Sequence, residues 1–267
     1  MDDPKRDEAT ARFAELVHRS DDDMPLDEAA MLIAAHAYPG LDVAAELARL
    51  DDAARGCAPG DLDGLRHHLF EVLGFSGNTS RYGDPRNSFL NDVLERRLGI
   101  PISLAVVTME VGRRVDVPLE GIGMPGHFLV RHGAEPRILV DPFGGGRIVD
   151  EATCEALLRS VYGPSAVFDA SMLAPVGKRA ILARMLANLR QLYLATGDVR
   201  SAGWVIRLRT TIPADTVAEM ADVASAYAAL GRFEEAATVL EDLADLLPED
   251  SAQRARAEAK LQRSRLN

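Results

Sequence analysis

Apolar residues recur every three or four positions through the first 75 residues, which is the spacing of amphipathic helices. Four such stripes are separated by turn-forming residues, and they cover residues 13–17, 26–34, 43–50 and 65–73. Between residues 77 and 87 the chain is dense in Gly, Asn, Ser, Asp and Pro, which favour turns. The pattern predicts a helical segment over residues 1–80 that ends in a loop.

The middle of the chain combines helices with short strands. Residues 87–98 can form a helix that Gly99 stops, and Pro101 starts another, because proline suits the first helical position. Four short runs separated by Gly and Pro then read as strands, over residues 119–122, 127–131, 137–140 and 147–149. We therefore predict an α+β core over residues 81–150, within a first domain of residues 1–175.

The last third of the chain is helical and contains an internal repeat. Three residues recur 34 positions later: Tyr193, Gly197 and Ala202, as Tyr227, Gly231 and Ala236. This period, with glycine at a turn and alanine where two helices pack closely, is typical of tetratricopeptide (TPR) repeats. We expect two TPR-like units and a capping helix in an all-α region of residues 176–267. A helical bundle with coincidental spacing is the alternative.

The composition and charge of the chain exclude several classes of protein. The 267 residues are 47% hydrophobic and 27% charged, so a core can form without disulfides, and Cys57 and Cys154 make no disulfide framework. A net charge of −11 argues against binding to nucleic acid or to anionic membranes. No apolar stretch approaches the roughly 18 residues of a membrane-spanning helix, and the first residues lack a signal-peptide core. We expect a cytoplasmic protein.

Three residues of the α+β core have the types and spacing of a catalytic triad. Ser103 lies in the first turn of the helix that starts at Pro101, where backbone N–H groups and the helix dipole favour negative charge. If the hairpin turn centres on residue 134, His127 faces Asp141 across two strands, and His132 faces Pro136. Asp141 could then orient His127 as the base for Ser103. The same residues also have ordinary structural roles, as a helix cap, a packed histidine and a turn-forming aspartate.

Asn87 and Asn91 are four residues apart and therefore share one helix face. They could line the cleft or donate to an oxyanion. They could equally cap and staple their helix, and we favour this structural role.

Two segments resemble a known family. They are NSFLNDVLERRLGIPISLAVVTMEVGRRVDVPLEGIGMPGHFLVRH, residues 87–132, and ILVDPFGGG, residues 138–146. Both are similar to a bacterial family with a transglutaminase-like core and C-terminal TPR repeats, of the B1 type of invasion-gene regulator, and to a segment of a eukaryotic F-box protein. The resemblance implies a papain-like core in which a helix carries the nucleophile and a sheet carries His and Asp. Active relatives of this fold have Cys at the helix position, which Ser103 matches here.

Two functions follow from these observations, and neither needs a metal or an organic cofactor. In the favoured one, a catalytically weak transglutaminase-like domain, a pseudoenzyme, is joined to TPR-like helices that bind a protein or peptide partner. In the alternative, Ser103, His127 and Asp141 form a hydrolase, peptidase or acyl-transferase site that acts on amide bonds.

Overall fold

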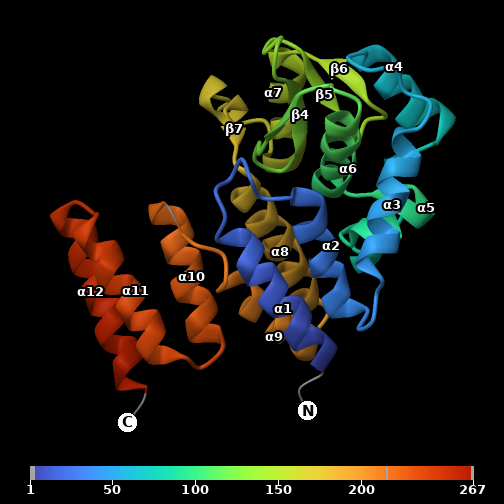
Figure 1. Ribbon diagram of the computed structural model, residues 1–267. Coiled ribbons are helices and arrows are strands. Elements are labelled where there is room, and N and C mark those ends of the chain that lie inside the picture. Colours follow the sequence, from blue (N-terminus) through green and yellow to red (C-terminus); the bar gives the residue numbers. More distant parts are fainter. Residues whose placement is uncertain (1–3, 215, 266–267) are drawn as a thin grey trace. The chain divides into compact units, whose positions relative to one another are not determined.

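A computed structural model gives the fold of residues 4–214 and 216–265 (Figure 1). The chain divides into two compact units, residues 1–185 and 186–267. The division falls inside one helix, α8 (Lys178–Ala195). Among the described residues, no helix is long and apolar enough to cross a membrane.

Helices dominate the start of the first unit: α1 (Pro4–Val17), α2 (Leu26–Ala37), α3 (Val43–Ala54) and α4 (Leu62–Arg66), which continues as a π-helical turn, His67–Val72. Their starts follow local chemistry, since Asp42 accepts from the amide of Ala45 before α3 and Asp61 accepts from that of Gly64 before α4. The prediction of an amphipathic helical segment is confirmed, because the apolar stripes are buried, with Phe13, Ile33 and Leu50 fully enclosed.

The segment predicted as one helix over residues 87–98 is shorter than expected. It consists of a 3₁₀ turn (Pro85–Asn87) and then α5 (Leu90–Arg96), which ends where Arg97 adopts a φ of +58°. A short strand, β2 (Leu98–Gly99), pairs in parallel with β1 (Ser76–Gly77). The next helix, α6 (Pro101–Arg114), starts at the predicted proline.

A five-stranded antiparallel sheet follows α6, in the order β6-β5-β4-β3-β7. Its strands are β3 (Leu119–Ile122), β4 (Leu129–His132), β5 (Leu139–Asp141), β6 (Arg147–Val149) and β7 (Pro175–Val176). Two predicted strands are therefore displaced, because β4 begins two residues after His127 and β5 begins two residues after Arg137.

Helices cover both faces of this sheet. On one face Leu119 of β3 packs against Gly112 of α6. On the other, Leu129 and Leu139 form an apolar cluster with Cys154 of α7 (Glu151–Tyr162). Figure 1 shows α6 and α7 flanking the strands. This is the α+β arrangement that the sequence predicts.

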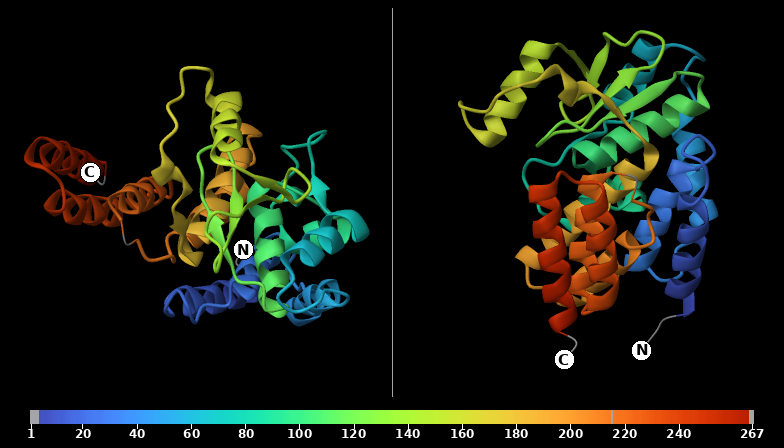
Figure 2. Two further views of the ribbon diagram at one scale, coloured as in Figure 1. Left: turned by 90° about the horizontal axis from the view of Figure 1, so that it is seen from above. Right: turned by 90° about the vertical axis from the view of Figure 1, so that its left-hand side faces the viewer.

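The second unit is built from helices. It contains the end of α8, and then α9 (Val199–Arg209), α10 (Val217–Ala229), α11 (Phe233–Asp245) and α12 (Glu249–Ser264). Helices α10, α11 and α12 lie side by side in Figure 2. Gly197 and Gly231, which are 34 residues apart, both follow a helix and have φ values of +74° and +72°. The all-helical prediction is confirmed, and the assignment of TPR repeats stays a prediction.

Candidate functional site

His127 is positioned by a tight turn rather than by a strand. Its amide donates to the carbonyl oxygen of Met124 at 3.2 Å, which closes a four-residue turn through Pro125 and Gly126. Gly126 has a φ of +73°, and proline followed by glycine with positive φ is the signature of a type II turn. The imidazole is almost buried, with 10% of the side chain exposed.

The imidazole binds Asp141, the last residue of β5. Nε2 of His127 lies 2.8 Å from Oδ1 of Asp141. The same carboxylate accepts from the amide of Gly144 at 3.0 Å and from the guanidinium of Arg147 at 3.1 and 3.2 Å. Burial by itself raises the pKa of Asp141, but His127, Gly144 and Arg147 together hold that pKa below its ordinary value.

Asp141 therefore remains a carboxylate that can orient His127. Since Asp141 takes Nε2, the nitrogen of His127 left for other partners is Nδ1. Within the part of the chain that the structure describes, Nδ1 makes no hydrogen bond.

The predicted register of the hairpin is wrong by two residues. Val130 pairs with Val140, and the amide of His132 donates to the carbonyl of Ile138, so the turn centres on residue 135 and His132 does not face Pro136. Proline has no N–H to donate to the ladder, which disfavours pairing that begins at Pro136. His127 and Asp141 are therefore not directly opposed. Their side chains still meet, for two reasons. The register differs from the predicted one by an even number of residues, which keeps both side chains on the same face of the sheet. The turn before β4 also directs the imidazole of His127 toward Asp141.

Ser103 is a cap inside α6. Its Oγ accepts from the amide of Ile100 at 3.0 Å and donates to the carbonyl oxygen of Asn87 at 2.6 Å, with the carbonyl of Ile100 at 3.1 Å as the other acceptor in reach. The residue is fully buried. No hydrogen bond joins Ser103 to His127, both of which the structure describes. The three predicted site residues therefore separate into a His127–Asp141 pair and a capping serine.

Asn87 fixes the loop that precedes α5. Its side-chain amide donates to the carbonyl oxygens of Arg81 and Tyr82, and its Oδ1 accepts from Asn78 at 2.9 Å. Both amide protons are therefore used within the protein, which supports the structural role over an oxyanion donor. Asn91 is buried on α5, and its Oδ1 has no hydrogen-bond partner.

Phe143 connects the two parts of the site. It lies in the segment ILVDPFGGG that resembles the family, but it was not predicted as a site residue. Its ring lies edge-on to both His127 and Tyr82, with centroids 6.0 Å apart in each pair. It also lies on Gly77 of β1, where any β-carbon would stand 2.6 Å from the ring. Gly77 pairs with Gly99, which lies beside the Ser103 hydroxyl. Contacts thus run from Ser103 to His127 through two glycines and an aromatic ring.

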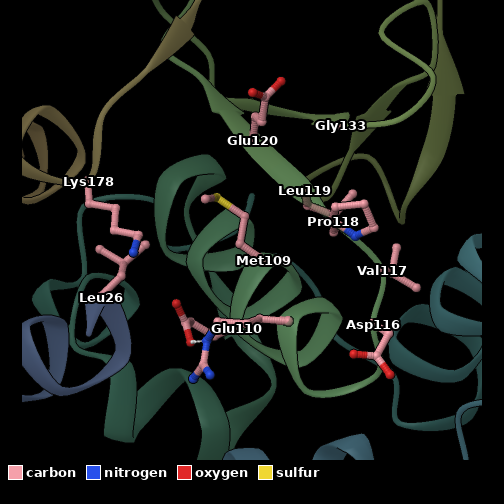
Figure 3. Close-up of a pocket in the computed structure, with 11 residues that line it drawn as sticks. Leu26, Met109, Glu110, Asp116, Val117, Pro118, Leu119, Glu120, Gly133 and Lys178 are labelled. Atoms are coloured by element: carbon pink, nitrogen blue, oxygen red, sulfur yellow. Dashed lines mark hydrogen bonds and ion pairs between the residues drawn. The ribbon is translucent and has the colours of Figure 1, made fainter. Parts of the chain in front are cut away.

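A separate cavity of about 670 Å³ lies at the other end of α6 (Figure 3). Met109 and Glu110 of α6, Leu119 of β3 and Lys178 line part of it. Burial, followed by the charge of Asp27, raises the pKa of Glu110, while Arg113 bonds to its carboxylate at 2.8 Å. The buried carboxylate of Glu110 is therefore already paired, and none of the residues that line this cavity belongs to the predicted triad.

The two cysteines are free thiols. Burial first, and then the charge of Asp150, raises the pKa of Cys154 to about 11, which makes it a poor nucleophile. Burial also raises the pKa of Cys57. Among residues 4–214 and 216–265, no three His, Cys, Asp or Glu side chains come together as a metal site requires.

Comparison with known proteins agrees with this architecture. The profile of the transglutaminase-like superfamily matches residues 36–187. A UPF0162 protein of Xylella fastidiosa strain Temecula1 is 39% identical over 242 residues, covering 85% of this chain and 86% of the relative. A UPF0162 protein of Pseudomonas aeruginosa is 37% identical, covering 66% of this chain and 68% of the relative.

A more distant relative has a different overall length. The human F-box only protein 21 is 34% identical over 140 residues, which are 49% of this chain and 21% of that protein. No solved structure matches the chain significantly.

Proposed function

This chain belongs to the transglutaminase-like superfamily, and from that membership we propose that it is a protein-interaction module that binds a peptide segment without forming an acyl intermediate on Ser103. In the proposal, the peptide lies on the surface around His127 and Phe143. The helices of the second unit, with their TPR-like spacing, supply a further docking surface for the protein partner.

The observation that carries the proposal is the state of the Ser103 hydroxyl. A serine nucleophile depends on a neighbouring base to take its proton. Here the proton goes to the carbonyl of Asn87, and the oxygen accepts from the N-cap amide of α6. Attack on a substrate would require this fully buried hydroxyl to leave both partners and reach solvent.

A second candidate function rests on a different observation. The His127–Asp141 pair, at 2.8 Å, has the orientation that a general base needs, and Nδ1 of His127 makes no hydrogen bond within residues 4–214 and 216–265. If Ser103 rotates away from Asn87, the three residues would act as a hydrolase or acyl-transferase on amide bonds.

Alkylation of a thiol placed at position 103 tests the two proposals against each other. The rate at which iodoacetamide modifies a Ser103→Cys variant is measured from pH 5 to 10, with and without His127→Ala. An interaction module predicts a slow reaction with a pKa at or above the free-thiol value of about 8.5, independent of His127.

A catalytic geometry predicts the opposite result. A thiol paired with His127 would titrate in the range of about 3.5–7.5, and removal of His127 would return it to the ordinary value. Such a result would overturn the module and support the hydrolase. Replacement of Cys57 and Cys154 by alanine in all variants keeps the signal specific to position 103.

A further inference from the structure

Arg184 lies next to His127 although 57 residues separate them in the sequence. It is on α8, and its Nη2 donates to the carbonyl oxygens of Met124 at 2.9 Å and His127 at 2.8 Å. These two carbonyls flank the turn that positions the imidazole. The guanidinium is therefore fixed to the same turn as His127.

The charge of Arg184 is not balanced by a carboxylate of the residues that the structure describes. A guanidinium has five N–H donors, and the two on Nη2 are taken by backbone carbonyls. No carboxylate among the described residues pairs with it, and the titratable side chains near it are Tyr162 and Tyr82. Burial lowers the pKa of this guanidinium. A half-buried cation without a counter-ion is costly for folding alone, which indicates that it serves a ligand.

Aromatic rings surround this cation. Phe128 lies beneath it, with the guanidinium carbon 5.4 Å from the ring centroid. Tyr82 and Tyr162 are both more than half exposed, although large aromatic side chains are commonly buried. Tyr82 also contacts Phe143, which contacts His127. The charge and the exposed rings thus lie around one imidazole.

We infer that Arg184 is a binding residue for a peptide carboxylate, and that the exposed rings of Tyr82 and Tyr162 hold the apolar side chain next to it. Nε and Nη1 point to different edges of the guanidinium, and either can donate a charge-assisted hydrogen bond to one carboxylate oxygen. Nη1 lies over Gly123, a residue without a side chain to block it. This inference rests on the proposed peptide-binding function and gives it a ligand class: a peptide in which an acidic group follows an aromatic residue.

A local cation is required if this acidic chain is to bind an acidic ligand. The chain as a whole carries a net charge of −11, so an acidic peptide is repelled in general and needs a local cation to bind. Most arginines that form side-chain interactions among the described residues bind acidic side chains, as Arg147 binds Asp141. Arg184 differs because its acceptors are neutral backbone oxygens, which leaves its charge for an incoming anion.

Fluorescence anisotropy with four labelled peptides tests the inference. The first has an internal Phe-Glu pair and an amidated end, and the second replaces that Glu by Gln. The third ends in Phe with a free carboxylate, and the fourth is the amide of the third. The full-length wild type is expected to bind a carboxylate form about tenfold to hundredfold more tightly than its neutral counterpart. Preference for the first or the third peptide identifies a side-chain or a terminal carboxylate.

Variants of the full chain assign the effect to one residue. Arg184→Gln is expected to remove the preference for carboxylate while the neutral peptides keep their affinity. Arg184→Lys is expected to restore part of the preference, because a lysine keeps the positive charge. Arg137→Gln, at an exposed arginine of the hairpin loop, is the control with the same charge change. Thermal unfolding of each variant shows whether the fold is intact.

The outcomes separate this inference from the proposed function. Equal affinity of wild type for charged and neutral peptides would overturn the role of Arg184 and leave peptide binding standing. A carboxylate preference that survives undiminished in a folded Arg184→Gln variant would also overturn it. Failure of all four peptides to bind the wild type would count against both.

Discussion

A single hydroxyl decides how the candidate site is interpreted. The side chain of Ser103 has the position expected of a nucleophile, in the first turn of α6, yet its oxygen is engaged by Ile100 and Asn87. Serine at this third helical position also returns a hydrogen bond to the N-cap amide, as the acidic residue of a capping box does. A serine at this position is thus compatible with a nucleophile and with a helix cap, and only its hydrogen-bond partners distinguish the two roles.

The pH dependence of stability should reveal the buried charge of Asp141. Its pKa is lowered in the folded protein, so its stabilising contribution is complete above the unfolded value of about 3.9 and is lost as the pH falls through the lower, folded value. Asp141→Asn is expected to reduce the free energy of unfolding by about 1–3 kcal/mol at pH 7. The difference from wild type should shrink below about pH 4.

Urea denaturation between pH 7 and pH 2.5 measures this effect. Asp52→Asn, at an exposed surface ion pair with Arg55, is the control and should change little at any pH. A deficit of the Asp141→Asn variant that stays constant across this range would show that the carboxylate charge does not stabilise the fold.

At the level of elements, the sequence was most informative where local chemistry dominates. Gly99 and Pro101 mark the start of α6. The strands over residues 119–122 and 147–149 have the predicted bounds. Periodicity and turn residues act within a few positions, so these elements can be identified from the chain alone.

Tertiary contacts determined the features that the sequence did not predict. The hairpin register depends on a loop in which Nδ1 of His132 accepts from the amide of Glu135, a detail that alternation of apolar residues does not encode. Arg184 is remote in sequence from His127 and carries no motif, so its place at the site could not be predicted. The hydrogen bond from the Ser103 hydroxyl to the carbonyl oxygen of Asn87 spans 16 residues, and the sequence pattern likewise did not predict it.

One aspartate joins three helices of the second unit. Asp222 of α10 accepts from Arg190 of α8 at 2.9 Å and from Arg209 of α9 at 2.9 Å. Because the side chain of Arg209 is only 4% exposed, loss of the carboxylate leaves a buried charge without its ion pair. Asp222→Ala is expected to lower the free energy of unfolding of this unit by about 2–5 kcal/mol.

Trp204 is the single tryptophan of the chain and lies on α9, so its fluorescence reports on this unit. Chemical denaturation followed at this tryptophan measures the effect. Asp242→Ala, at an exposed position of α11, should leave the midpoint nearly unchanged. An Asp222→Ala midpoint equal to that of this control would contradict a stabilising role for the ion pairs.

At the scale of the whole molecule, charge is the property that the sequence determines most directly. With 30 basic and 41 acidic residues, the chain lacks the positive field that phosphate binding requires. We expect no binding to a 20-base-pair DNA duplex at 50 mM salt, measured by fluorescence anisotropy up to 10 μM protein. Salt-sensitive binding in this range would reveal a local basic surface that outweighs the net charge.

The capped serine has a consequence for how such a chain evolves. Selection for a well-formed α6 is enough to retain Ser103, because its hydroxyl closes two backbone hydrogen bonds whether or not any chemistry occurs. A buried His–Asp pair is different, since apolar residues of similar volume often replace such a pair at no cost to stability. Among descendants that lost their ligand, the serine should therefore be retained while His127 and Asp141 are substituted. Retention of the His–Asp pair, and not of the serine, would then indicate that the function is kept.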